Sequence, residues 1–172
     1  MEHNGTEHEK IFKKFLRKHI ACVQEAGRKL GVPQEQLDNH DLSKWSAEEF
    51  PAYAKRFCGN SIPNEFAMAR LHHYHLNPHH WQHFIFPDGY TPKGSNLENG
   101  VVQMPENYAL EMVADWMGET KVRTNSWDMT DWLKVNMFSI RVHSTTAEFL
   151  YQVLDELGYG NEQRFLTELQ KG

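Results

Sequence analysis

The spacing of apolar residues in segment 9–30 constrains the fold more than any other feature of this 172-residue chain. Apolar side chains recur there three or four positions apart, at Phe12, Phe15, Leu16, Ile20, Val23, Ala26 and Leu30. This spacing places them on one face of an α-helix, which Gly31-Val32-Pro33 should end. His19 lies on the same face, so we expect an imidazole within an otherwise apolar interface.

Helical signals continue along the chain, and strand signals are weak throughout. Pro78 should end a helix at Asn77, because a proline disfavours the α conformation in the residue before it. Asn77 could then cap a new helix that has Pro78 at its first position. The other predicted helices are Ser46–Phe57 with Glu49 in a capping box, 61–77, Pro105–Gly118, Trp127–Ile140, Thr145–Leu157 and Asn161–Leu169. We therefore predict an all-α helical bundle.

Length and composition favour one domain over residues 1–172, with a motif-bearing core at about 10–118 and further helices at 120–172. Hydrophobic residues make up 40% of the chain, which argues against disorder. The net charge of −5 argues against binding duplex nucleic acid. Segment 120–172 is expected to complete the core, and a homodimer surface is the alternative.

The expected location is the cytoplasm. No apolar run is long enough to span a membrane. The N-terminal segment is polar and acidic, unlike a signal peptide. Cys22 and Cys58 have no metal-like spacing and are expected to be free thiols. The segment Pro87–Gly100 is rich in Gly, Pro, Asn and Asp, and we predict a loop that closes over a binding site.

Histidines are concentrated in one internal segment. Residues 69–84, ARLHHYHLNPHHWQHF, hold six of the eleven histidines. Imidazole and carboxylate groups together suit first-row divalent metal ions. The adjacent pair His40-Asp41 offers one nitrogen and one oxygen to the same ion. Glu111 and Asp115, four positions apart, share a helix face that should point inward, where each carboxylate needs a partner.

The order of His19, His40-Asp41, further histidines and a distant Asp115 resembles the HD-domain superfamily of metal-dependent phosphohydrolases. That superfamily is all-helical and holds its first metal ion with the pattern H…HD…D. The resemblance implies an HD-like fold here, with His19, His40, Asp41 and Asp115 as the ligands of a first metal ion.

Three blocks, HDLSK, HYHLNPHH and EMVADW, are more closely similar to a small family described only as a domain of unknown function. Its pattern is HDxSK, HxxxNxHH and EMxxDW. The resemblance adds His73, His79 and His80 as candidate ligands, with Asn77 between them. It leaves open whether one or two ions bind. His72, His75 and His83 fall outside the pattern and are expected to face solvent or to pack.

Several residues are candidates for substrate binding and catalysis. If His79 and His80 begin a helix, its N-terminal N–H groups would favour an anion. Lys44 could pair with the same anion, and Asn77 shares a helix face with His73. We therefore predict that Lys44, Asn77 and His79 bind substrate. Glu49 and Glu111 are candidates either to orient an imidazole or to act as a general base, which makes them, with Lys44, the predicted catalytic residues.

The leading functional hypothesis is a phosphohydrolase that acts on a small phosphate ester or nucleotide. It would use one or two ions of Mn, Fe, Co, Ni or Zn to activate water. Two alternatives remain open. The first is an HD-type di-iron oxygenase, because a histidine-rich site suits iron. The second is a non-catalytic metal-binding or interaction module, whose metal site would be closed.

Overall fold

The computed structural model describes residues 6–86, 93–95 and 97–160. The α-helices of this part are α1 (Glu7–Leu30), α2 (Gln34–Asn39), α3 (Phe50–Phe57), α4 (Pro63–Leu76), α5 (Glu106–Thr124), α6 (Thr130–Asn136) and α7 (Ser144–Glu156). Three short 3-10 helices, η1 (Leu42–Trp45), η2 (Trp81–Phe84) and η3 (Met137–Ser139), connect them. Only isolated β-bridges occur among these residues, at Ile85–Val101 and Glu98–Val101. The prediction of an all-α fold is confirmed.

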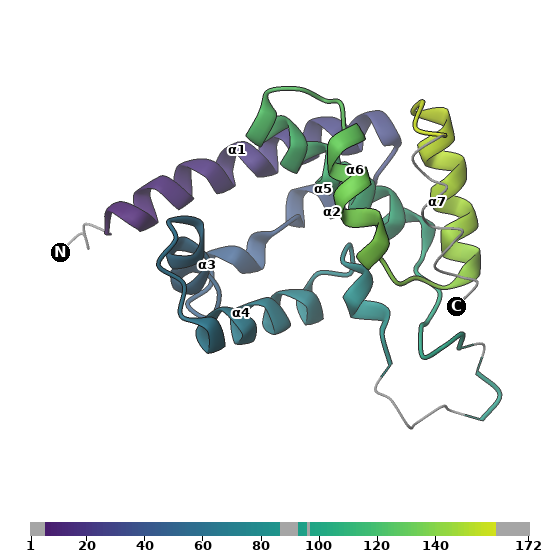
Figure 1. Ribbon diagram of the computed structural model, residues 1–172, viewed down its shortest axis with the longest axis horizontal. Coiled ribbons are helices and arrows are strands. Elements are labelled where there is room, and N and C mark those ends of the chain that lie inside the picture. Colours follow the sequence, from purple (N-terminus) through teal and green to yellow (C-terminus); the bar gives the residue numbers. More distant parts are fainter. Residues whose placement is uncertain (1–5, 87–92, 96, 161–172) are drawn as a thin grey trace.

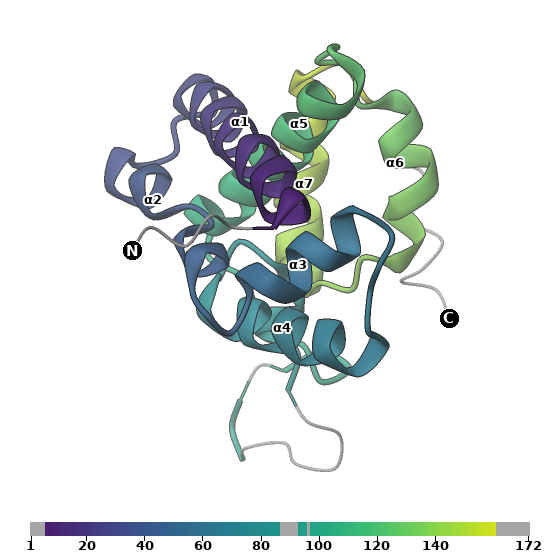
Figure 2. The ribbon, with the colours of Figure 1, turned by 90° about the vertical axis from the view of Figure 1, so that its left-hand side faces the viewer.

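Helices α1 and α5 form the central pair of the bundle. They pack on each other more extensively than any other two elements, while α3 packs against α1 and α4 lies on the other side of α3 (Figures 1 and 2). Gly118 makes this pairing close, because an added Cβ would lie 2.4 Å from Cγ2 and 2.9 Å from the backbone nitrogen of Val23. The prediction that Gly118 ends the helix was therefore wrong. The helix continues to Thr124 and ends at Asn125, which adopts the left-handed conformation.

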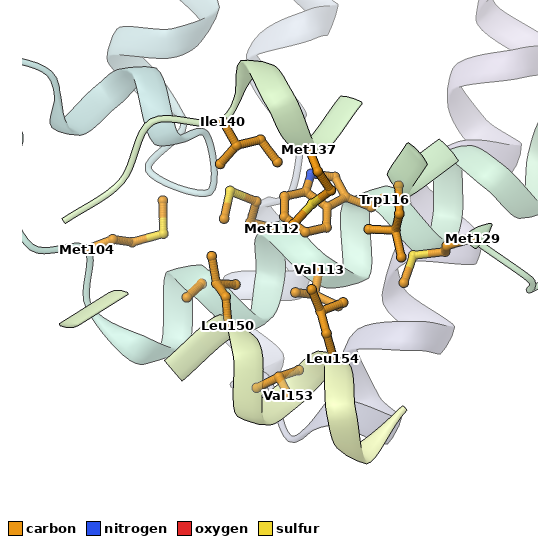
Figure 3. Packing of buried hydrophobic residues seen from close by; sticks show 12 residues of the cluster. Met104, Met112, Val113, Trp116, Met129, Met137, Ile140, Leu150, Val153 and Leu154 are labelled. Carbon is orange, nitrogen blue, oxygen red and sulfur yellow. The ribbon is translucent and has the colours of Figure 1, made fainter. Parts of the chain in front are cut away.

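The main hydrophobic core lies between α5 and the C-terminal helices. Side chains from α5, α6, η3 and α7 interdigitate there (Figure 3). The fully buried members include Met112, Val113, Met129, Leu133, Met137, Leu150 and Leu154. The described part of segment 120–172 therefore completes the core, as expected.

Helix α3 begins later than predicted. The expected capping box at Ser46 and Glu49 does not form, and the helix starts at Phe50 without a side-chain cap. Glu49 is instead fully buried, and its carboxylate accepts hydrogen bonds from His72 and His73. Because the Glu49 carboxylate is hydrogen-bonded to two imidazoles in the interior, it cannot also cap the start of the helix.

The helix predicted to start at Pro78 is also absent from the described chain. Asn77 is extended, with φ −121° and ψ 93°, as its place before proline requires. Residues 78–80 then form a turn, and the short η2 follows. The side-chain amide of Asn77 donates to Ser43 and to the carbonyl of His73, so it does not cap a following helix. His79 and His80 therefore gain no helix dipole, which removes that argument for an anion site.

The remaining predictions on the C-terminal half have mixed outcomes. The single helix expected at Trp127–Ile140 is divided into α6 and η3, whereas α7 agrees with the helix expected at Thr145–Leu157. The helix expected at Asn161–Leu169 and half of the predicted loop Pro87–Gly100 lie outside the described residues. Among the described helices, none combines the length and apolarity needed to cross a lipid bilayer.

Candidate metal centre

The seven predicted metal ligands come together from separate parts of the chain. Helix α1 supplies the first, the turn between α2 and η1 the next two, α4 and the turn after it three more, and α5 the last. They are His19, His40, Asp41, His73, His79, His80 and Asp115. Asp41 is completely buried, and the side chains of His40 and His73 are 1% exposed.

One carboxylate oxygen of Asp41 faces the first group of candidate ligands, which consists of His19, His40, Asp41 and Asp115. Asp41 Oδ2 lies 3.3 Å from His19 Nε2 and 3.6 Å from His40 Nε2. Asp115 Oδ1 lies 3.0 Å and 3.6 Å from the same two nitrogen atoms. Two imidazole nitrogens and two carboxylates therefore converge on one point.

The other oxygen of Asp41 faces a second group, which consists of Asp41, His73, His79 and His80. Asp41 Oδ1 lies 3.3 Å from His73 Nε2 and 3.7 Å from His79 Nε2. His73 Nε2 and His80 Nε2 are 2.8 Å apart. In this group one ligand atom from each residue lies within 4.8 Å of all the others. Asp41 thus stands between the two groups and presents one oxygen to each.

The backbone of Asp41 supports this arrangement. Its φ of 59° and ψ of 14° place it in the left-handed region, which side chains other than Gly, Asn and Asp rarely enter. The sharp turn lets the adjacent side chains of His40 and Asp41 face the same point. Left-handed backbone conformations of residues other than glycine are energetically unfavourable, and they cluster at functional sites.

Several ligand atoms have no hydrogen-bond partner among the described residues. They are buried and comprise Nε2 of His19, His40 and His79 and Oδ1 of Asp41. An unpaired buried polar atom costs about 1–3 kcal/mol, so a cluster of four needs an explanation. Metal ions bound to these atoms would provide it, since imidazole nitrogens and carboxylate oxygens are typical ligands of first-row divalent ions. The residues therefore fit the predicted cofactor.

Carboxylates on the outer side of the imidazole rings hold the ligands in place. Glu111 Oε1 lies 2.7 Å from His40 Nδ1 and 3.2 Å from His79 Nδ1. Glu49 Oε2 lies 2.8 Å from His73 Nδ1. A Nδ1–H group that donates to a carboxylate leaves Nε2 with a free lone pair for a metal ion. Of the two roles considered for Glu49 and Glu111, the geometry supports orienting an imidazole.

A further layer of amide and hydroxyl groups was not predicted from the sequence. Gln36 donates to Glu111 Oε2 and to the carbonyl of Asn107, whose side chain donates back to Gln36 over 2.7 Å. Ser43 Oγ lies 3.1 Å from His73 Nδ1 and accepts a hydrogen bond from Asn77. Ser43 lies within the HDxSK block, so that block contained a signal for its role.

Asn77 and the other histidines have structural contacts. The amide of Asn77, predicted to bind substrate, donates over 2.7 Å to the backbone carbonyl of His73, which is a positioning contact. Of the three histidines outside the motif, His72 contacts Glu49 over 2.7 Å, whereas His75 and His83 are exposed. His72 therefore has a more specific role than the packing or solvent-facing role expected of it.

Strong electrostatic coupling holds the centre together. Burial lowers the pKa of His40, but the charge of Asp41 and hydrogen bonds to Asp115 and Glu111 outweigh it and raise that pKa to about 10. Burial raises the pKa of Glu111, yet its bonds to His40 and His79 lower it to about 2. The pKa of Asp41 is likewise held well below its usual value, against burial, by Lys44 and His40. In the absence of metal, ion pairs with imidazolium groups neutralise the carboxylates.

A cavity of about 530 Å³ opens onto the first group of ligands. His19, Asp115 and Lys44 all contribute to its lining. Lys44 Nζ lies 2.6 Å from Asp41 Oδ2, so its charge lies beside the candidate metal ligands. Arg56 and Arg123, which were not among the predicted site residues, line the same cavity. An ion bound at the first group would therefore be reachable by a small molecule.

Comparison with known protein families matches residues 8–156 to DUF5662, a family of unknown function. Searches of curated proteins and of solved structures found no match. None of these comparisons links the chain to the HD-domain superfamily, so that relationship stays a prediction. The family match is consistent with the resemblance of the three motifs to an uncharacterised family. Because it spans most of the sequence, the chain belongs to the family of unknown function DUF5662.

Proposed function

We propose that this protein is a metal-dependent phosphohydrolase that acts on a small phosphate ester. One observation carries the proposal: the carboxylate of Asp41 has one oxygen within 3.3 Å of His19 Nε2 and the other within 3.3 Å of His73 Nε2. A carboxylate shared by two ligand groups is suited to bridge a pair of ions. Paired ions are common in phosphate-ester hydrolases, and the resemblance to the HD superfamily agrees with this reading.

Different residues would hold the metal ions and bind the substrate. The first group would hold one ion beside the cavity, and the second group would hold another. Bound ions would supply Lewis-acid polarisation of a phosphoryl oxygen and activation of water. Lys44 lines the cavity next to Asp41, where its positive charge attracts the phosphoryl group and stabilises charge that develops on it.

Glu111 and Glu49 act in this proposal through the imidazoles that they hold. Each carboxylate accepts hydrogen bonds from imidazole Nδ1–H groups. These bonds make Nε2 of the same ring a better metal ligand and fix the ring plane. They are positioning residues, because their contacts are to His40, His79, His72 and His73. Asn77 holds His73 differently, since its side-chain amide donates to the backbone carbonyl of His73.

Turnover of a panel of phosphate monoesters tests the proposal. Protein purified without chelators and supplemented with Mn²⁺, Fe²⁺, Co²⁺, Ni²⁺ or Zn²⁺ should release inorganic phosphate. His40→Ala and Asp41→Ala should abolish the release while the helical circular dichroism remains. His75→Ala, an exposed histidine on α4, is the matched control and should retain full activity. Equal turnover in the wild type and both ligand variants would rule the proposal out.

A di-iron oxygenase is the second candidate. The observation that favours it is the high proportion of nitrogen, with imidazoles of His19, His40, His73, His79 and His80 and only two carboxylates in the two groups. Ligand sets of this kind suit iron. Iron that co-purifies with the protein, together with substrate-dependent oxygen consumption and no release of phosphate, would select this function.

A purely structural metal site is the third reading. Structural sites are closed by protein ligands, whereas catalytic sites keep a position open. The cavity beside His19 and Asp115 favours an open position. A metal-loaded protein whose ligand shell holds no exchangeable water would instead support the structural role.

A further inference from the structure

The cavity beside the first group of ligands has walls of aromatic rings. Five half-buried aromatic side chains line it from four different helices: Phe15 of α1, Tyr53 and Phe57 of α3, Phe66 of α4 and Trp132 of α6. Aromatic rings that remain partly accessible around one cavity offer flat apolar surface to a ligand.

This apolar surface begins directly at a metal ligand. The ring of Phe15 stacks on the ring of His19, with centroids 6.1 Å apart and planes 9° apart. Phe57 continues the wall, with its ring centroid 4.5 Å from that of Phe15. If a phosphate were bound at the first ion, the organic group attached to it would therefore contact the rings of Phe15 and Phe57.

The other side of the cavity has the same character. Trp132 stacks on Trp116 with centroids 5.0 Å apart, and Trp116 follows the ligand Asp115 in the sequence. The guanidinium of Arg56 lies 5.6 Å from the ring centroid of Phe66, and that of Arg123 lies 5.2 Å from the centroid of Phe15. Both guanidinium groups lie over ring faces at the cavity. Arg123 is also paired with Glu119, which lines the same cavity, so Arg56 supplies the charge that favours an anionic ligand.

We infer that the cavity selects phosphate monoesters whose alcohol is flat and apolar, such as an aryl alcohol, over esters of sugars. The inference rests on the proposed function, because it places the phosphate at the first ion and Lys44. The aromatic ring of the ligand then lies between Phe15, Phe57 and Trp132. A sugar in the same position would have to give up water from its hydroxyl groups against apolar rings, which is unfavourable.

Two phosphonates that differ only in the organic group provide a direct test. Phenylphosphonate and methylphosphonate share the same anionic head, and neither can be hydrolysed at its carbon–phosphorus bond. Calorimetry with Mn²⁺-loaded protein should show at least about tenfold tighter binding of phenylphosphonate, equivalent to about 1.4 kcal/mol. Because the heads are identical, the contribution of the ion cancels in the ratio of the two dissociation constants.

Alanine variants show which aromatic side chains cause the preference for phenylphosphonate. Phe57→Ala and Trp132→Ala should each reduce it to less than about threefold, chiefly through weaker binding of phenylphosphonate. Phe138→Ala removes a half-exposed aromatic ring that does not line this cavity and should keep the full preference. Two variants are used because Phe57 also packs on the buried Phe12, and thermal unfolding will show whether either variant loses its fold.

The outcomes separate this inference from the proposed function. Equal affinities in the wild type, no binding of either phosphonate, or a preference retained in both folded variants would overturn the inference. A preference for phenylphosphonate without hydrolysis of any ester would support the inference and reject the hydrolase. Hydrolysis of phenyl phosphate and glycerol 3-phosphate with equal kcat/KM would support the hydrolase and reject the inferred preference for flat, apolar alcohols.

Discussion

The Nδ1 atom of His40 lies 2.7 Å from Oε1 of Glu111, in a contact that is buried on both sides. This contact fixes the ring of His40 with Nε2 directed toward Asp41. Because Glu111 also reaches His79 Nδ1 at 3.2 Å, one carboxylate orients a ligand of each group. Glu111 is therefore the residue that couples the two groups from outside.

Removal of Glu111 should weaken metal binding without removing a ligand. We expect Glu111→Ala to lower the affinity for Mn²⁺ or Zn²⁺ about 10–100-fold, because both imidazoles lose the partner that fixes their orientation. Competition with a metal-binding dye measures this. Glu106→Ala, at an exposed acid in the first turn of the same helix, should leave the affinity unchanged. Identical affinities for Glu111→Ala and the wild type would show that the contact has no role in binding.

Metal binding should release protons. The pKa of His40 in the metal-free protein is raised to about 10 by Asp41, Asp115 and Glu111 despite the opposing effect of burial. The ring is therefore protonated near neutral pH, and it must lose a proton before Nε2 can bind an ion. Affinity should thus increase as the pH rises, up to about tenfold per unit for each proton released. Calorimetry in buffers of different ionisation enthalpy counts the protons, and an affinity independent of pH between about pH 6 and about pH 8 would contradict this expectation.

Chelation should destabilise the folded protein. An ion present at 100 times its dissociation constant adds about 2.7 kcal/mol to the free energy of unfolding, provided that it does not bind the unfolded chain. For a chain of this size, each kcal/mol shifts Tm by roughly 2–4 °C. We expect a lower Tm in EDTA and recovery of the original Tm after the metal is restored. If protein shown to bind metal had the same Tm with and without EDTA, the metal site could not be one that forms only in the folded state.

Gly118 should be intolerant of any side chain. Gly118→Ala places a methyl group 2.4 Å from Cγ2 of Val23, so we expect a loss of about 1–3 kcal/mol in the free energy of unfolding. Urea denaturation measures this loss. Val23→Ala in the same chain should relieve only part of it, because the backbone nitrogen of Val23 remains 2.9 Å from the new methyl group. Unchanged stability in Gly118→Ala would mean that α1 and α5 are not closely packed there.

Periodicity and motif spacing were sufficient for the parts of the fold that depend on local sequence. The apolar face of α1 predicted that His19 points inward, and the spacing of Glu111 and Asp115 predicted that both acids face the interior. The structure buries His19 and Glu111, each 3% exposed, whereas Asp115 is 16% exposed and lines the cavity. These positions follow from helix geometry alone.

Contacts between distant segments could not be predicted in this way. Gly118 looks like a helix end in the sequence, and only the approach of Val23 reveals why a glycine is needed. Glu49 resembles a capping residue until His73, 24 positions away, is seen beside it. The aromatic rings that line the cavity come from five helices, α1, α3, α4, α5 and α6, which lie far apart in the sequence. Local patterns carry no information on such pairings.

The metal content of wild-type and single-ligand variants tests the central claim that Asp41 lies between two metal-binding groups. We predict about two equivalents of a divalent ion in protein purified without chelators, and about one equivalent in His19→Ala and in His73→Ala, each of which removes a ligand from one group. Asp41→Ala should retain neither ion. A wild-type protein that takes up no metal, even after incubation with Mn²⁺, Fe²⁺, Co²⁺, Ni²⁺ or Zn²⁺, would contradict the account and leave the imidazoles as hydrogen-bonding residues of the core.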